Sequence, residues 1–187
     1  MQLFEFLMVL MSIIVGLGIA ALLTGVADLL RARRESTLYW VHGMIVLTIF
    51  LALAQVWWES RALRTVPEWT FVGLLLMLAS PTCLFMIAHL LFPRDPDVTD
   101  YEKYYFEVAQ ALWLLGAAAA TVGSLFRPIV FGETLLVVDN LSSLPTILIC
   151  VSLALTNNRR AHALLAPSLL VVVFLDIVLI NRIIGAG

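Results

Sequence analysis

Long apolar stretches, separated by short polar connections, run through almost the whole chain. A helix that crosses a bilayer needs about 20 mostly apolar residues, and six stretches meet that requirement. They are residues 3–30, 38–58, 68–92, 106–126, 134–155 and 163–184. Because these stretches use nearly all of the sequence, we predict a single domain over residues 1–187. Its fold is an all-α bundle of six transmembrane helices.

The composition supports a membrane protein and argues against nucleic-acid binding. The 187 residues are 62% hydrophobic and 13% charged, and the mean hydropathy is +1.02. Soluble domains typically contain about 45–50% apolar and ~25% charged residues. The net charge of −2 provides no basic surface for nucleic acid. The expected partner is therefore the lipid bilayer.

The positive charges of the connections predict an orientation. Connections after the first, third and fifth stretches hold seven Lys and Arg residues, and the opposite side holds four. The first group is Arg31, Arg33, Arg34, Arg94, Lys103, Arg159 and Arg160, and the second is Arg61, Arg64, Arg127 and Arg182. Since Lys and Arg concentrate on the cytoplasmic side, we expect both chain termini outside the cytoplasm.

Small residues at intervals of four suggest an internal repeat. They are Gly16, Ala20 and Thr24 in the first stretch and Gly116, Ala120 and Ser124 in the fourth. Residues four apart share a helix face, and small ones let two helices approach closely. Two halves of three helices would be inverted relative to each other, as in several transporter folds. The alternative is that such stripes are ordinary features of a membrane bundle.

The segment 137–146 is unusually polar for its place in an apolar stretch. Its polar residues are Asp139, Asn140, Ser142, Ser143 and Thr146. Hydroxyl groups can bond the carbonyls of their own helix, so the serines and the threonine are weak signals alone. Pro145 interrupts the helical hydrogen bonding, and Pro81 does the same in the third stretch. Such breaks occur at solute sites near the middle of a membrane, and they are also ordinary kinks.

Asp176 is the most informative single residue. It lies inside the stretch 163–184, with no other charge within five positions. Insertion scales assign about 2.5–3.5 kcal/mol to an aspartate at the centre of a transmembrane helix, so we expect it to face the bundle interior or a cavity. We expect its partners in the segment 137–146, whereas Gln55 and Glu59 are expected to reach the outer interface. The alternative is a protonated Asp176 that only links two helices.

A second set of polar residues is predicted near the cytoplasmic ends of the helices. It consists of Asp28, His42, His89, Glu107 and Gln110. These groups could form a proton relay, or each could simply reach the lipid headgroups. Two imidazoles on neighbouring helices could also ligate haem or a metal ion, although the sequence has no CxxCH motif for covalent haem. The main expectation is that no cofactor and no metal is bound.

Part of the sequence resembles a known class of proteins. The residues concerned are Gly16-Leu17-Gly18-Ile19-Ala20, Arg31-Ala32-Arg33-Arg34, Tyr39-Trp40-Val41-His42, Trp57-Trp58 and Glu68-Trp69-Thr70-Phe71. Together they resemble small uncharacterised bacterial inner-membrane proteins with several spans. The resemblance covers roughly the first half of the chain. It implies a bacterial inner membrane and no particular activity.

Three functional hypotheses follow. The leading one is a small channel or transporter for an ion or a proton-coupled solute, with protonation-linked gating at a buried carboxylate. The second is a non-conducting accessory or assembly subunit that docks partner helices on its small-residue faces. The third is a membrane haem protein that uses His42 and His89. We expect a homo-oligomer or a membrane partner subunit in each case. We expect no enzyme, since no nucleotide-binding, potassium-filter or zinc-protease motif occurs.

Overall fold

The computed structural model consists of α-helices arranged in a bundle. It describes residues 3–31, 37, 39–66, 69–95, 98–132, 134 and 143–184. The helices are α1 (Leu3–Arg31), α2 (Trp40–Glu59), α3 (Phe71–Leu90), α4 (Tyr101–Phe131), α5 (Ser143–Ala154) and α6 (Arg159–Ile184), with a short 3-10 helix η1 (Ser60–Thr65) after α2. The predicted all-α membrane bundle is confirmed. Five of the described helices are long and apolar enough to cross a membrane.

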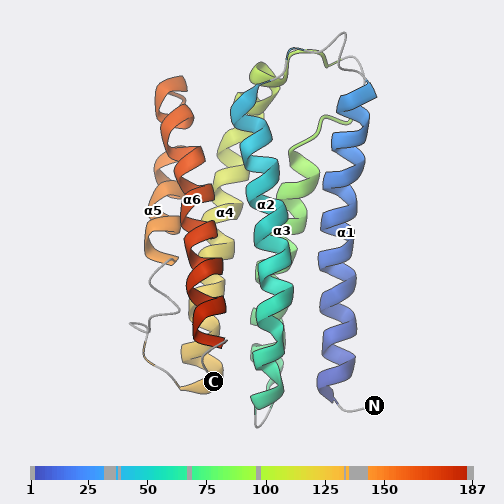
Figure 1. The fold of residues 1–187 in the computed structure, drawn as a ribbon, viewed down its shortest axis with the longest axis vertical. Coiled ribbons are helices and arrows are strands. Elements are labelled where there is room, and N and C mark those ends of the chain that lie inside the picture. Colours follow the sequence, from blue (N-terminus) through green and yellow to red (C-terminus); the bar gives the residue numbers. More distant parts are fainter. Residues whose placement is uncertain are drawn as a thin grey trace.

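The long helices run roughly parallel to one axis and alternate in direction (Figure 1). We call the end at which α1 begins and α2 ends the lower end, as drawn in Figure 1, and the opposite one the upper end. The most extensive contacts are those between α3 and α4, α4 and α5, α1 and α3, and α2 and α6. In an inverted repeat of α1–α3 and α4–α6, α4 corresponds to α1 and α6 corresponds to α3. The fourth helix would then pack on α6 as α1 packs on α3. Because α4 packs mainly on α3 and α5 instead, the packing does not favour the repeat.

The small-residue stripes of the two halves also lie in different surroundings. Gly16 and Ala20 of α1 are exposed on the outside of the bundle. Gly116 of α4 faces α5, and a Cβ atom added there would lie 3.1 Å from the Sγ atom of Cys150. The stripe on α4 therefore serves the packing inside the bundle, whereas the stripe on α1 faces outward.

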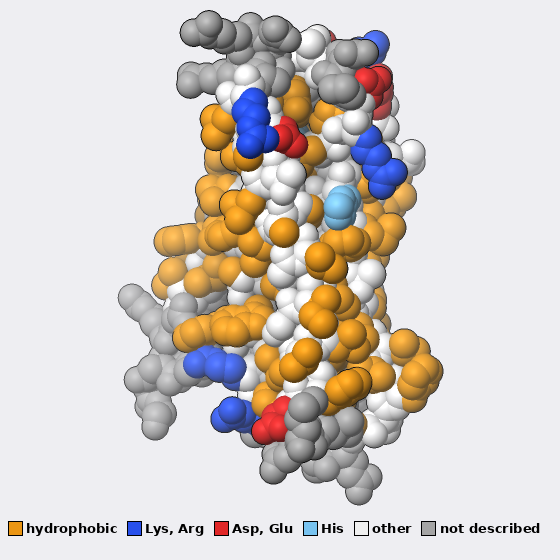
Figure 2. Space-filling view, turned by 90° about the vertical axis from the view of Figure 1, so that its right-hand side faces the viewer, with side chains coloured by type: hydrophobic (Ala, Val, Ile, Leu, Met, Phe, Trp, Pro, Cys, Tyr) orange, Lys and Arg blue, Asp and Glu red, His pale blue; other side chains and the backbone are white. Residues whose placement is uncertain are grey.

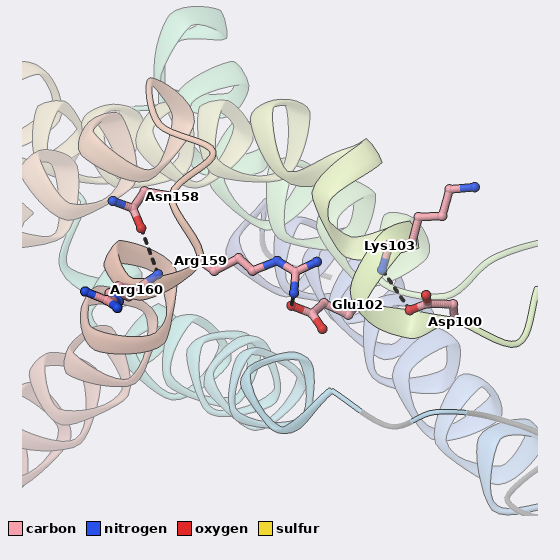
Figure 3. Close-up of polar contacts among 6 residues, drawn as sticks. All are labelled: Asp100, Glu102, Lys103, Asn158, Arg159 and Arg160. Carbon is pink, nitrogen blue, oxygen red and sulfur yellow. Dashed lines mark hydrogen bonds and ion pairs between the residues drawn. The ribbon is translucent and has the colours of Figure 1, made fainter.

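Polar side chains fix the first turns of three helices. The Thr70 hydroxyl accepts from the Gly73 N–H at 3.1 Å at the start of α3. Asp100 Oδ1 accepts from the Lys103 N–H at 3.0 Å before α4, and Asn158 Oδ1 accepts from the Arg160 N–H at 2.9 Å before α6 (Figure 3). Each cap satisfies a donor that the helix itself leaves unpaired. The fourth and sixth helices consequently begin earlier than the predicted 106 and 163.

The fifth helix is described over only part of its predicted range of 134–155. The described helix α5 has 12 residues, about 18 Å at 1.5 Å per residue, whereas the hydrocarbon core is ~30 Å thick. Residues 135–142 lie outside the described part. Pro145 falls in the first turn of α5, where a proline is tolerated because its missing N–H has no partner anyway. The predicted break at Pro145 thus falls near the start of the described helix, and the described part of α5 lies in the upper part of the bundle (Figure 1).

The surface matches a lipid environment. Large apolar side chains such as Phe71, Leu148 and Leu155 are exposed, at 73%, 67% and 79%. On the face drawn in Figure 2, hydrophobic side chains form a broad band, and the Lys, Arg, Asp and Glu side chains lie toward the two ends. An apolar belt between two charged ends is the pattern that a bilayer requires. We conclude that the chain is a multi-pass membrane protein.

Two glycines of α1 allow a matched test of this packing. A Cβ atom at Gly25 would overlap the ring of Phe92, whereas nothing lies within 4 Å of a Cβ atom added at Gly16. We expect Gly25→Ala to lower the free energy of unfolding by about 1–3 kcal/mol through overpacking. Gly16→Ala should leave it unchanged or raise it by about 0.5–1 kcal/mol through helix propensity. Unfolding in mixed micelles, followed by circular dichroism, measures both. Equal effects of the two variants would contradict the placement of α1.

Candidate functional site

The lower half of the bundle contains a cavity of about 460 Å³. All six helices contribute residues to its walls, together with Ser60 and Leu63 of η1. Its walls on α2 run from Thr48 to Glu59, and those on α4 run from Gly116 to Phe131. Both helices run downward in these parts, so the cavity extends from the middle of the bundle toward its lower end. A volume of this size lies within the ~300–1,000 Å³ range of ligand sites.

Asp176 of α6 lines this cavity and is bonded to the neighbouring helix α2. Gln55 Nε2 donates one N–H to Asp176 Oδ2 and another, at 2.8 Å, to Glu59 Oε1. The amide group of Gln55 therefore bridges two carboxylates. In the described structure Asp176 thus has a partner on α2 that the sequence did not predict, whereas two of its predicted partners, Asn140 and Ser142, lie outside the described residues. Glu59 is exposed as expected, but Gln55 is half-buried and points to Asp176.

Further polar groups line the same cavity. Ser143, Thr146 and Cys150 of α5 contribute to its wall, as do Ser80 of α3 and Arg127 of α4. The structure therefore places two residues of the predicted polar segment, Ser143 and Thr146, in one cavity with Asp176. The other three residues of that prediction, Asp139, Asn140 and Ser142, lie outside the described residues. The sequence did not predict Ser80 or Arg127 as residues of this site, because a lone serine and an arginine near a helix end carry no specific signal.

The upper half of the bundle, in contrast, is tightly packed. Most of the large side chains that are fully buried lie there, namely Leu22, Val41, Ile45, Ile87, Leu91, Tyr105, Leu112, Trp113, Leu153 and His162. They come from all six helices. Protein interiors packed in this way leave few voids as large as a water molecule. The cavity is therefore closed toward the upper end by side chains.

A hydrogen-bonded chain of three side chains runs through this packed half. The Trp113 Nε1–H donates to Tyr105 Oη at 3.0 Å, and the Tyr105 hydroxyl lies 2.6 Å from His162 Nδ1. His162 Nε2 lies 2.7 Å from the carbonyl oxygen of Thr156. A carbonyl can only accept, so Nε2 carries the proton of the neutral ring and Nδ1 accepts from Tyr105. All three side chains are buried.

The sequence did not predict this series of hydrogen bonds from Trp113 to Thr156. His162 precedes the predicted span 163–184 and follows two arginines, so it was not considered as a buried group. Its partners Tyr105 and Trp113 lie about 50 residues earlier in the sequence. They are eight residues apart, which is close to two helical turns, and this spacing is a weak signal of one shared face.

An ion pair at the upper surface joins the same two helices. Arg159 Nη1 lies 3.2 Å from Glu102 Oε1, at the starts of α6 and α4 (Figure 3). Tyr39, which precedes α2, packs on Tyr105 with ring centroids 5.4 Å apart. Burial, with the Glu102 carboxylate second, raises the pKa of the Tyr39 phenol above its ordinary value. The phenol therefore stays neutral beside the ion pair.

The predicted upper polar set is dispersed in the structure. Asp28 forms an exposed ion pair with Arg31 at 2.8 Å. His42 is buried and its Nε2–H donates to the Leu91 carbonyl oxygen at 2.6 Å. The other members, His89, Glu107 and Gln110, are exposed. These residues share a level in the bundle, as expected from the sequence, but they do not face one common site.

The arrangement offers little support for a haem or a metal ion. An iron held by His42 and His89 would need both imidazoles to point to one place, yet one is buried in the contact between α2 and α3 and the other is exposed. Within the described ranges, there is no group of three or more His, Cys, Asp or Glu side chains that could hold a metal ion. The haem hypothesis stays a prediction, and the absorption spectrum of the purified protein tests it.

No protein-family model, no curated protein and no solved structure matches the chain.

Proposed function

We propose that this membrane protein provides a pathway for a small cation or a proton-coupled solute, with Asp176 as the group that binds the cation or proton. The observation that carries the proposal is the position of Asp176 inside a membrane helix and on the wall of a 460 Å³ cavity. Ionisable groups within membrane helices are costly and mark ion pathways and proton relays. A purely structural aspartate needs a hydrogen-bond partner but no cavity.

The bridge through Gln55 supports a site that responds to protonation. In the described state Gln55 Nε2 donates to both Asp176 and Glu59, which suits two ionised carboxylates because these only accept. A proton or a cation at Asp176 removes its negative charge. A protonated Asp176 also gains an O–H donor, for which the carbonyl of a rotated Gln55 amide is an acceptor. Binding at Asp176 therefore changes the contact between α2 and α6.

The shape of the bundle supports access from one side at a time. The cavity extends toward the lower end, and the upper half is closed by packed side chains such as Tyr105, Trp113 and His162. Transporters commonly expose a fixed site to one side and close it to the other. We assign the described arrangement to the state that faces the lower end. Transport then requires a second state in which these packed side chains separate at the upper end.

A flux measurement tests the proposal. The purified protein is reconstituted into liposomes that contain a pH-sensitive dye, and a pH gradient is imposed with small cations on one side. We expect the protein to speed the decay of the gradient. Vesicles that stay as tight as protein-free ones, with every cation tried, would contradict a pathway.

The location and orientation are part of the same proposal. We place the chain in a bacterial inner membrane with both termini outside the cytoplasm, which makes the lower end the outer side. An alkaline phosphatase fused to the C-terminus is then active in the periplasm, whereas a fluorescent protein at the same position stays dark. The opposite pair of signals would invert the orientation.

One observation keeps the accessory-subunit hypothesis as a second candidate. The stripe of Gly16, Ala20 and Thr24 on α1 is exposed in the single chain, and small residues let partner helices approach closely. A stoichiometric partner protein that purifies with the chain and is lost on Gly16→Leu, together with inactive liposomes, would favour this role over a pathway.

A further inference from the structure

We propose that the lower ends of α1 and α2 form a binding site for one anionic phospholipid. A groove of about 620 Å³ lies on the outside of the bundle at this position. It is separate from the cavity around Asp176, and none of its lining residues lines that cavity. The site is independent of the proposed pathway.

The groove has two chemically different parts. Its apolar part is formed mainly by Phe4, Met8, Val9 and Ile13 of α1, whereas Arg61 and Arg64 of η1 lie at its lower end. From Phe4 to Ile13 the helix rises about 14 Å, close to the ~15 Å depth of one lipid leaflet. The apolar part therefore matches an acyl chain in length, and the arginines lie where a headgroup would be.

The two guanidinium groups are held in place by aromatic rings. Arg61 Cζ lies 3.5 Å from the centroid of the Trp58 ring, and Arg61 Nε donates to the Trp58 carbonyl oxygen at 3.3 Å. Arg64 Cζ lies 5.5 Å from the ring centroid of Phe4. Such contacts orient a guanidinium and leave N–H groups for a phosphate, which Arg binds through two parallel hydrogen bonds. Ordered arginines lose less side-chain entropy when they bind a ligand.

The base of the groove is also fixed. The Trp57 Nε1–H donates to the Ser12 hydroxyl at 3.2 Å and so links α2 to α1. Trp57 and Trp58 belong to the residue type that favours the headgroup level.

The charges favour an anionic lipid over a zwitterionic one. The groove contains the two arginines and one acidic residue, Glu5, which gives a net charge of +1. A phosphatidylglycerol headgroup, with one negative charge, neutralises this site. The quaternary ammonium group of a phosphatidylcholine headgroup adds a positive charge, which the two arginines repel, instead.

Lipid titrations followed by native mass spectrometry test the site. The purified protein in mild detergent is titrated with phosphatidylglycerol and, separately, with phosphatidylcholine. Each Arg near a membrane surface contributes ~1 kcal/mol of attraction, so Arg61→Ala/Arg64→Ala should weaken phosphatidylglycerol binding roughly 30-fold. The control Arg94→Ala/Arg160→Ala removes two exposed charges at the upper end and should leave the dissociation constant unchanged.

Two further variants keep the test decisive. Arg61→Lys/Arg64→Lys retains the charges and should bind more weakly than the wild type but more tightly than the alanine pair. Val9→Trp fills the apolar part without changing any charge and should also weaken binding. Equal binding of both lipids by the wild type, or unchanged binding in both the alanine pair and Val9→Trp, would overturn the proposal. If Arg61→Ala/Arg64→Ala weakened phosphatidylglycerol binding while Val9→Trp bound it normally, the arginines would attract anionic lipid without a fitted acyl-chain groove. That result would also overturn the proposal.

Discussion

Replacing Asp176 by asparagine is expected to reduce cation- or proton-coupled flux in reconstituted vesicles to the level of protein-free vesicles. Asparagine has nearly the same shape, and its carbonyl oxygen can still accept the N–H of Gln55 that Asp176 accepts now. It carries no charge and cannot take up a proton. The variant therefore removes the proposed chemistry and retains the contact between α2 and α6.

The matched control is Glu107→Gln. Glu107 is an exposed carboxylate near the start of α4, and it lies outside the cavity that Asp176 lines. Its replacement by an isosteric amide should leave the flux at the wild-type rate. Gln55→Leu should reduce the flux as well, because both carboxylates lose the donor that connects them. Full flux in Asp176→Asn would remove the carboxylate from the mechanism and leave it a link between two helices.

The sequence predicted the fold well because membrane helices are dictated by local composition. A run of about 20 apolar residues has few alternatives to a helix in lipid, since every backbone N–H and C=O must be satisfied within the segment. Five of the six predicted spans correspond to long apolar helices of the structure. Their ends moved by a few residues because single side chains such as Asp100 and Asn158 cap the first turns.

The sequence was less informative where distant segments meet. The position of Asp176 pointed to a buried polar site, since a lone charge inside an apolar helix is costly. Its partner Gln55 could not be predicted, because it lies 121 residues away and depends on which helices become neighbours. The predicted span 134–155 is described as a helix only over Ser143–Ala154, and residues 135–142 lie outside the described part. Apolar composition over 134–155 is compatible with a full span and with the described 12-residue helix.

Replacing His162 by alanine is expected to cause the largest loss of stability among the three histidines. The ring of His162 is 0% exposed and connects Tyr105 of α4 with the Thr156 carbonyl before α6. Without it, the buried Tyr105 hydroxyl loses its acceptor, which costs about 1–3 kcal/mol. The emptied volume adds a cavity term, so the total should approach the ~3–5 kcal/mol of large core truncations.

His89→Ala provides the matched control for this loss. His89 is an exposed residue of α3, and the centroid of its ring lies 4.6 Å from that of Phe85, edge to face. Because the side chain is exposed, its removal should change the free energy of unfolding by less than about 0.5 kcal/mol. Both variants are unfolded with dodecyl sulfate in mixed micelles and followed by far-ultraviolet circular dichroism. Comparable stability of His162→Ala and His89→Ala would show that the chain from Trp113 to Thr156 contributes no more than a surface contact. A large loss confined to His162→Ala, in contrast, would show that the hydrogen bonds of His162 to Tyr105 and to the Thr156 carbonyl stabilise the packed upper half of the bundle.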